Sequence, residues 1–488
     1  MKLFATFATV CASVAMGSSA FAEGGYYSGT LGAQASGRSG AFTAKADDIT
    51  AVSYNPAGLA KIETTLIQVG NQFSYNASSF TRASTTNYAI SSNPTVNFSK
   101  VKNGAPWQAL DPMLGVASNL GLRNWGFALA AYAPPGVSKE EFPVDGGQRY
   151  MMVSREVMMF KFVGSAAWKY ADLFGVGATA EWIYVPSLKY SIVIDGTNQG
   201  RAANPVSSGF DVLATMTGSA AFTFNAILGA WYRPAPFLEF GLSGQVVPTN
   251  IVAHSNLAVS PIGSQFGGDP ITLSRGNGLA NDVTLTLPLP MLFRSGARYR
   301  HLEGGREIYD IELDVEYETW SRVNRFTVDT NGLEADGNGQ HFDLKQINVE
   351  KHWRDTIAVK LGGDYAVIPD QLTLRGGGFY ESAVSDAAYA NVDFSSGQKI
   401  GGSVGASIFF GRTELAIAYQ LRFQPTVSVS EADGRVYQQV PGSPCTAPYT
   451  DTTACNEHYL GKQGTPTVNA GTYNAMSHIV ALDVLYRY

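Results

Sequence analysis

The stretch from Ile308 to Trp320, IYDIELDVEYETW, alternates between two kinds of side chain. One set is acidic and consists of Asp310, Glu312, Asp314, Glu316 and Glu318. The other set is mostly apolar and consists of Tyr309, Ile311, Leu313, Val315 and Tyr317. A period of two is typical of a β-strand, because successive side chains point to opposite faces of the sheet. The stretch therefore predicts a strand with one charged face and one apolar face.

The same alternation recurs along the chain, for example over 158–170, 174–184 and 413–423. Short turns and long polar stretches follow one another between these segments; the long ones include 191–214, 250–282, 326–350 and 430–473. Counting both kinds of connection gives about fourteen strands, an even number, as in bacterial outer-membrane barrels. We therefore expect an all-β, antiparallel, up-and-down transmembrane barrel.

Composition agrees with a barrel and argues against other classes. Charged residues make up 15 % of the chain, below the roughly 25 % of soluble domains. The mean hydropathy is −0.03, and no run of about 18 apolar residues follows residue 22, so a helical membrane protein is not expected. A net charge of −6 gives no reason to expect nucleic acid as a partner. A soluble sandwich would also alternate, but its hairpins need not switch between short and long.

Both ends of the chain carry targeting signals. Lys2 precedes an apolar segment, and Ala20-Phe21-Ala22 offers small residues for cleavage, so residues 1–22 are predicted to be a signal peptide. The last segment, SHIVALDVLYRY, ends on an aromatic and resembles the assembly signal of bacterial outer-membrane barrels. We expect a monomer in the outer membrane of a Gram-negative bacterium, with outer-membrane lipid, lipopolysaccharide and the barrel-assembly machinery as partners.

The acidic face of 308–320 is predicted to point into the barrel lumen. Neighbouring carboxylates on it would lie about 7 Å apart, which is tolerable only in a wet lumen or with paired charges. The preceding strand offers partners at Arg294, Arg298 and Arg300. A hairpin turning at Gly304-Gly305 would bring Arg298 opposite Asp310 or Glu312, and Arg294 near Asp314. We interpret this arrangement as a charge ladder that stiffens the wall, or alternatively makes the lumen polar or contacts a charged head group.

Two cysteines, Cys445 and Cys455, remain after signal cleavage. Two cysteines ten residues apart in an exported chain favour a disulfide. A metal site would need more ligands than His458 nearby, so no metal and no cofactor are expected.

The segment 23–63 is rich in Gly, Ala and Ser and lacks strand alternation. Asp47 or Asp48 could cap a short helix there, which Pro56 would end. A barrel of about fourteen strands is wide enough to leak unless something fills it. We expect residues 23–63 to form a plug, or hatch, inside a barrel made of residues 64–488.

Four segments resemble the long-chain fatty-acid outer-membrane transporter family (FadL type). They are SGRSGAFTAKADDITAVSYNPAGLAKI with Asn55-Pro56-Ala57, the span from GGQRYMM to AEWIYV, LPLPMLFRSGARY followed by DIELDVEYETWSRVNRF, and DYAVIPDQLTLRGGGFYESAV. The resemblance implies a fourteen-stranded barrel with an N-terminal hatch that passively imports hydrophobic molecules, chiefly long-chain fatty acids and in some members aromatic hydrocarbons. It also implies lateral release of the ligand through a gap in the wall.

The resemblance also places a ligand-capturing groove at the long loops 191–214 and 250–282. The second loop is unusually apolar, and the residues expected to contact ligand are Ile251, Val252, Leu257, Val259, Ile262 and Phe266. No basic residue that binds a carboxylate can be carried over from the family.

Three other functions stay open at this point. An outer-membrane lipase or protease would need a nucleophile and a base, and no such constellation surrounds the histidines. An open porin would conduct ions at once, whereas a hatched transporter would be nearly silent. An adhesin could use the loop 430–473, which a disulfide would stabilise by roughly 2–3 kcal/mol.

Overall fold

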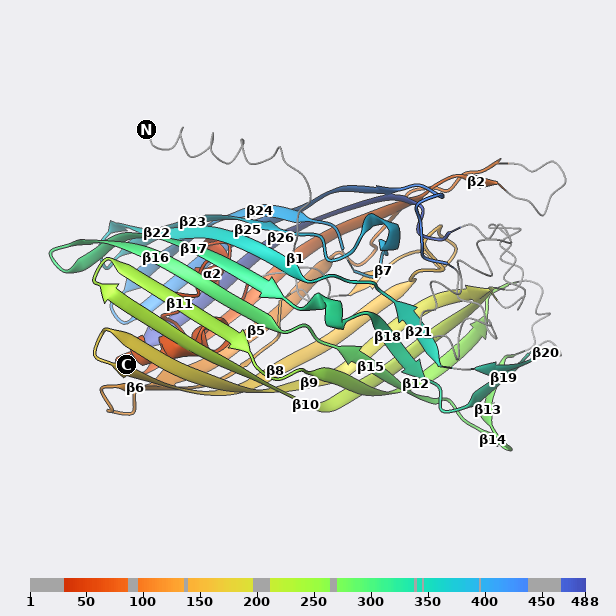
Figure 1. The fold of residues 1–488 in the computed structure, drawn as a ribbon, viewed down its shortest axis with the longest axis horizontal. Helices are drawn as coiled ribbons and strands as arrows, with labels where there is room; N and C mark the ends of the chain where they lie inside the picture. The colour runs from red at the N-terminus through yellow and green to blue at the C-terminus, as the bar shows by residue number, and fades with distance from the viewer. Residues whose placement is uncertain are drawn as a thin grey trace.

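A computed structural model describes residues 30–86, 95–135, 139–195, 211–263, 270–337, 340–344, 346–394, 396–437 and 467–488. In this part of the chain, neighbouring strands join in one antiparallel sheet that closes on itself (Figure 1). Closure is made by β1 (Leu66–Arg82), which pairs with the last strand, β26 (Gly471–Arg487), and on its other side with β5 (Trp107–Ser118). The predicted closed barrel of 14 strands is confirmed.

Some of the fourteen spans are continuous and others are broken in two. The continuous spans are β1, β8 (Ser154–Tyr170), β9 (Phe174–Asp195), β10 (Asp211–Ala235), β23 (Leu372–Glu381), β24 (Lys399–Phe410), β25 (Thr413–Val429) and β26. The broken spans are β4 (Val101–Lys102) with β5, β6 (Trp125–Tyr132) with β7 (Glu140–Glu141), β11 (Leu238–Gln245) with β12 (Asn250–Pro261), β15 (Asp282–Pro288) with β16 (Leu292–Glu303), β17 (Arg306–Glu318) with β18 (Arg325–Asp329), and β21 (Ile347–Glu350) with β22 (Thr356–Ile368). Proline or a 3-10 turn lies at several of the breaks, where the ladder of hydrogen bonds cannot continue.

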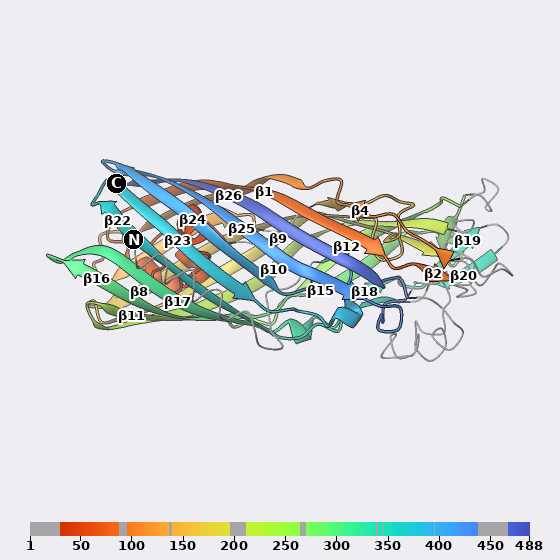
Figure 2. The ribbon, with the colours of Figure 1, turned by 90° about the horizontal axis from the view of Figure 1, so that it is seen from above.

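Smaller elements stand at the end of the barrel that carries the long connections (Figures 1 and 2). They are the ribbon β2 (Thr85–Thr86) with β3 (Thr95–Val96), and a four-stranded sheet of β13 (Thr272–Arg275), β14 (Gly278–Leu279), β19 (Leu333–Gly337) and β20 (Gln340–Leu344). The 3-10 helices η3 (Trp320–Arg322) and η4 (Ala387–Tyr389) also lie beyond or between strands. Parts of the stretches 250–282 and 326–350, which were predicted as loops, therefore form strands. The alternation is hidden in the sequence because apolar neighbours such as Ile251 and Val252 lie on opposite faces.

The short-turn end has the expected hairpins. Gly304 and Gly305 have φ of 58° and 82°, a conformation that two-residue hairpin turns require and that glycine adopts without steric cost. Rings such as Phe237, Tyr299 and Tyr309 contact one another near this end, with centroids 6.3 Å and 6.4 Å apart. Aromatic residues at this level are typical of the girdle at a membrane interface.

The two faces of 308–320 point as predicted. The five acids are buried, with Glu312 and Asp314 at 0 % exposure, whereas Leu313 on the other face is 46 % exposed. Apolar side chains thus form the outer surface of the barrel and the charges line its interior, which is the arrangement of a barrel surrounded by lipid.

The described N-terminal residues 30–62 lie inside the short-turn half of the barrel (Figure 1). They form α2 (Ala33–Gly37), α3 (Ala51–Tyr54) and the 3-10 helix η1 (Pro56–Lys61). Below, "hatch" denotes residues 30–62. Among the described residues, no helix combines the length and apolar character needed to cross a bilayer.

Candidate functional site: a hatch and an apolar cavity

The hatch ends its short helix where the sequence predicts. α3 stops at Tyr54, and Pro56 begins the next helix because its fixed φ suits a first helical position. Asn55 between them accepts from the backbone N–H of Ala57 (3.2 Å) and donates to the carbonyls of Thr43 (2.9 Å) and Ala230 (2.9 Å). One buried amide therefore ties together two turns of the hatch and strand β10.

Glycines of the barrel strands lie where the wall contacts the backbone of the hatch. A Cβ added to Gly126 would lie 2.2 Å from the carbonyl oxygen of Leu59, and one added to Gly177 would lie 2.6 Å from the backbone of Pro56 and Ala57. The same holds for Gly229, Gly241, Gly362 and Gly377. The sequence contains these inward-facing glycines in several strands. They indicate a contact with the hatch only once the hatch is known to fill the lumen.

Arg38 of the hatch connects to three carboxylates of the wall. Its guanidinium lies 2.7 Å from Asp310, 3.0 Å from Glu312 and 2.6 Å from Asp364, and its side chain is fully buried. A buried ion pair of this kind is stable only when hydrogen bonds satisfy the polar atoms of both partners. The predicted ladder did not include Arg38, although its charge within the Gly- and Ser-rich SGRSGAF was visible.

Other acids of the ladder bind the backbone of the hatch. Asp314 accepts from the N–H groups of Phe42 (2.9 Å) and Thr43 (2.9 Å), and Glu312 accepts from the N–H of Ala44 (2.6 Å). Carboxylates that accept backbone N–H groups make charge-assisted bonds, which are stronger than neutral ones. The acidic row is thus the docking surface of the hatch as well as a stiffener of the wall.

The arginines of β16 pair with the acidic row in a register shifted from the predicted one. Arg298 lies opposite Glu312, as one of the two predictions had it, but Arg294 lies opposite Glu316 rather than Asp314. The cause is an irregularity beside His301, which adds one residue to β17 after the hairpin turn.

Each arginine of this set pairs with an acid, and Arg298 and Arg300 share Glu307. Arg294 bonds Glu316 at 2.9 Å and the Ser53 carbonyl at 2.7 Å, and Arg300 bonds Glu307 at 2.6 Å. Arg298 contacts Asp310, Glu307 and, at 3.2 Å, Glu239. Glu318, the last acid of the row, accepts from the indole N–H of Trp320.

Above the hatch, toward the long loops, the inward-facing side chains become apolar and enclose a cavity. About 850 Å³ of space free of atoms lies there when the part open to solvent is included. The lining consists of Arg155, Val157, Met159, Val185, Leu188, Lys189, Tyr190, Met216, Ile251, Leu285, Leu287, Leu289, Phe326, Val328, Val349 and Phe394.

A bulge in β9 turns two successive sets of side chains toward this cavity. Val185 and Leu188 both line it although they are three residues apart, which a regular strand does not allow. The pairing of β9 with β8 and with β10 shifts register at this point, around Pro186. Such an extra residue bends the strand and redirects the following side chains.

Aromatic rings form one wall of the cavity. Phe326, Trp353 and Phe394 meet edge to face, with centroids 5.8 to 5.9 Å apart. The ammonium of Lys351 lies 4.7 Å from the Phe326 ring and pairs with Asp393, and both side chains are buried. This ion pair holds the segment that carries Phe394 against the inside of the barrel.

Arg155 is the buried cation of the cavity lining. Its Nη2 donates to Glu140 at 3.0 Å, and its guanidinium carbon lies 4.2 Å from the centre of the Phe394 ring. Its Nε is buried, and no group in the described part of the chain accepts from it. Lys189, which also lines the cavity, is exposed at its edge. Nε is covered by neighbouring atoms, so a ligand in the otherwise apolar cavity would accept from it once the Arg155 side chain turns.

The six residues predicted for a ligand groove separate into different places. Residues 250–261 form strand β12 and not a loop, so their side chains alternate: Ile251 lines the cavity and Leu257 is buried in the same cluster, whereas Val252 faces outward at 45 % exposure. Val259 packs against the cluster and Ile262 is exposed. Phe266, Cys445 and Cys455, like the predicted signal peptide, lie outside the described residues.

Comparison with known proteins shows a match to one protein family. The sequence profile of the outer membrane protein transport protein family (OMPP1/FadL/TodX) matches residues 11–461. No curated protein sequence matches the chain.

Solved structures with the same fold are distant in sequence. A Pseudomonas aeruginosa FadL homologue has a TM-score of 0.69 at 15 % identity, over 96 % of this chain and all of its own. The Ralstonia pickettii toluene transporter TbuX has a TM-score of 0.57 at 14 % identity, over 94 % of this chain and 98 % of its own. The P. putida toluene transporter TodX has a TM-score of 0.58 at 12 % identity, over 90 % and 94 %.

Taken with the hatch and the lipid-facing outer surface, the profile match identifies the predicted resemblance as a true relationship. The chain belongs to the OMPP1/FadL/TodX family, whose members are β-barrel transporters of hydrophobic compounds in the outer membrane of Gram-negative bacteria, not enzymes.

Proposed function

We propose that this protein passively imports long-chain fatty acids and that the apolar cavity is where they bind during passage. The observation that carries the proposal is the combination of apolar walls with the unused Nε donor of Arg155. A fatty acid matches both, because its chain is apolar and its head group accepts hydrogen bonds.

The energetics favour such an amphiphile over a purely polar solute. Each CH₂ buried in the cavity contributes about 0.8 kcal/mol, so ten of them contribute about 8 kcal/mol before the losses of binding. A hydrogen bond from a charged donor adds roughly 1.5–3 kcal/mol. A carboxylate that accepts from Arg155 would also satisfy a group that is otherwise buried without an acceptor.

An aromatic hydrocarbon is the second candidate. TbuX and TodX, which share the fold, are toluene transporters, and aromatic rings form one wall of the cavity here. A hydrocarbon, however, would leave Nε of Arg155 without an acceptor. The two ligands therefore differ in their dependence on Arg155.

We further propose that the ligand leaves sideways through the wall and not through the hatch. β8 pairs with β6 at 161–168 and with β7 at 154–155, so the neighbouring span is broken between these two pairings. Pro134 and Pro135 follow β6 and cannot donate to the ladder. Val157 and Met159, which line the cavity, lie on β8 between the two pairings, so the break between β6 and β7 borders the binding site.

The organisation of the rest of the chain is part of the same proposal. We propose that residues 1–22 are removed on export, that 23–63 serve as the hatch of a barrel of 64–488, and that Cys445 and Cys455 form a disulfide. We also propose a monomer that contacts lipid and lipopolysaccharide and is inserted by the barrel-assembly machinery.

Uptake assays with two substrates test the proposal. In cells that express the protein, Arg155→Met should lower uptake of radiolabelled oleate about tenfold, as expected for a loss of about 1.4 kcal/mol, and leave uptake of toluene unchanged. Arg306→Met, at an exposed ion pair with Asp370, is the control and should change neither. Folding is checked by the heat-dependent mobility shift of barrels. Equal loss for both substrates would assign Arg155 a structural role, and unchanged oleate uptake would favour the hydrocarbon.

A further inference from the structure

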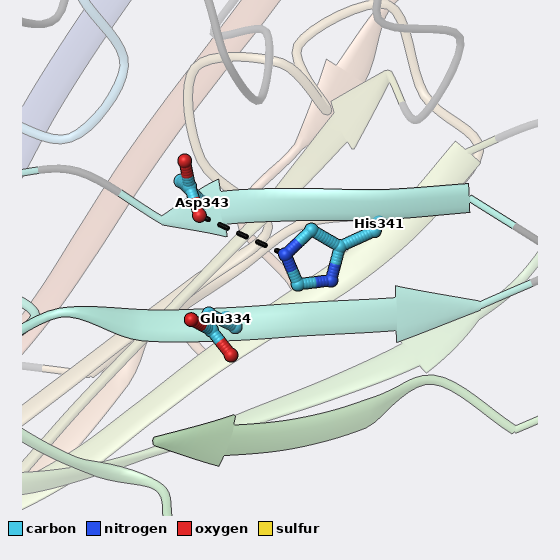
Figure 3. Close-up of side chains that lie close together, drawn as sticks. All are labelled: Glu334, His341 and Asp343. Carbon is cyan, nitrogen blue, oxygen red and sulfur yellow. Dashed lines mark ion pairs between the residues drawn. The ribbon is translucent and has the colours of Figure 1, made fainter. Parts of the chain in front are cut away.

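A group of metal-ligating side chains lies on the small sheet beyond the barrel, away from the cavity lining. Glu334 on β19 and His341 and Asp343 on β20 place one ligand atom each within 4.8 Å of the others (Figure 3). From the register of the two strands, Glu334 lies directly opposite Asp343, and Asp336 lies directly opposite His341. The group therefore occupies two rungs on one face of the ribbon, separated by the Ala335–Phe342 pair.

The position of each side chain is fixed by the amphipathic character of this sheet. Leu333 is buried, and Leu273 and Leu344 pack against the apolar cluster that lines the cavity. Residues that alternate with them must point to the opposite face, which is where Glu334 and Asp343 are found. The sheet thus covers the apolar cluster with one face and presents the ligand group to the medium with the other.

The histidine is oriented for metal binding. Its Nδ1 lies 2.8 Å from Asp336, and its Nε2 lies 3.7 Å from Asp343. An imidazole that donates one N–H to a carboxylate turns its other nitrogen outward as a ligand, an arrangement that recurs around protein-bound metals. Directly opposed carboxylates such as Glu334 and Asp343 repel each other, and a cation between them would remove that repulsion.

We propose that Glu334, His341 and Asp343 bind one divalent transition-metal ion, such as Zn²⁺ or Co²⁺, with Asp336 as the residue that positions the imidazole. One imidazole and two carboxylates suit such ions, and water would complete the coordination. Ligands of a tetrahedral ion lie about 3.4 Å apart, so side-chain atoms within 4.8 Å of one another need to close by up to about 1.4 Å, which exposed side chains can do. The ion would join β19 to β20 and stiffen the sheet over the cavity.

Calorimetric titration of the full-length protein in detergent, after treatment with EDTA, tests the proposal. Zn²⁺ should bind with one equivalent, and His341→Ala should weaken this binding at least about tenfold. His301→Ala is the matched control, since His301 is an exposed histidine beside a single carboxylate, Glu303, and should bind as the parent does. An absent Zn²⁺ signal in the parent, or equal binding by His341→Ala, would overturn the proposal.

A second variant separates positioning from coordination. Asp336→Asn should weaken Zn²⁺ binding about tenfold, because the carboxylate that holds the imidazole is gone, and Asp336→Glu, which keeps a carboxylate, should restore most of it. Oleate uptake in metal-free buffer should be unaffected by these variants, so failure of the metal site is distinct from failure of the transport proposal. Binding by Asp336→Asn equal to that of the parent would remove Asp336 from the site.

Discussion

The two halves of the lumen differ in the interactions that they offer: one is polar and filled by the hatch, and the other is apolar and partly empty. In the half filled by the hatch, Arg38 and the acids of β17 form ion pairs and accept backbone N–H groups. In the half toward the long loops, Val185, Leu285 and their neighbours form apolar walls, and Arg155 keeps one donor without an acceptor. The first half is held by ion pairs and hydrogen bonds between hatch and wall, whereas the second leaves apolar space for a ligand.

This difference determines which half can change during transport. Breaking a buried ion pair leaves a charge without its partner and costs several kcal/mol, so the hatch is held firmly. Replacing empty apolar space by an apolar ligand costs little and gains buried area. The comparison therefore favours a route in which the ligand enters the cavity and leaves beside β8, with the hatch in place.

The largest effect is expected from removing Arg38. Arg38→Met would leave Asp310, Glu312 and Asp364 buried without their shared cation, which costs about 3–5 kcal/mol. The hatch should then detach, and single-protein conductance in a planar bilayer should rise from near silence to that of an open pore. Arg306→Met, at an exposed pair, should stay silent. A closed Arg38→Met barrel would show that glycine contacts and backbone bonds hold the hatch without the ion network.

How far the sequence predicted these two halves depends on the kind of signal. The period of two in 308–320 identified the strand, its lipid face and its inward acids, because a strand has only two faces. The partners of those acids were only half predicted. Pairing within a hairpin is local and follows from the turn, apart from the irregularity beside His301, but the link from Arg38 to Asp310 joins residues 272 positions apart.

The cavity was harder to predict than the hatch. Ile251 and Leu257 were selected as apolar residues of a loop, but they are apolar because strand β12 continues beyond the membrane and faces the cavity. Val252 was selected for the same reason and faces outward. Arg155 could not be distinguished from other basic residues, because its role depends on the side chains that surround it and not on its neighbours in sequence.

A smaller effect is expected where the hatch backbone touches the wall. Gly126→Ala would place a Cβ 2.2 Å from the carbonyl oxygen of Leu59, and relieving this contact should cost about 1–3 kcal/mol in the free energy of unfolding by urea. Gly164→Ala in the neighbouring strand β8 is the control, since its Cβ would meet only Leu129 at 3.6 Å, an ordinary contact. Equal stability of the two variants would mean that the hatch can shift at little cost, contrary to the comparison of the two halves.

The smallest effect concerns the cavity, where two adjacent residues allow a matched test. Ile251→Trp would fill space that we assign to the ligand, and oleate uptake should fall about tenfold, equivalent to 1.4 kcal/mol. Val252→Trp adds the same ring to the outward-facing side of β12 and should leave uptake unchanged. Neither variant should alter conductance, because the hatch is untouched. If Ile251→Trp also opened the barrel to ions, the cavity and the hatch would be coupled, and transport would involve both halves rather than the apolar half alone.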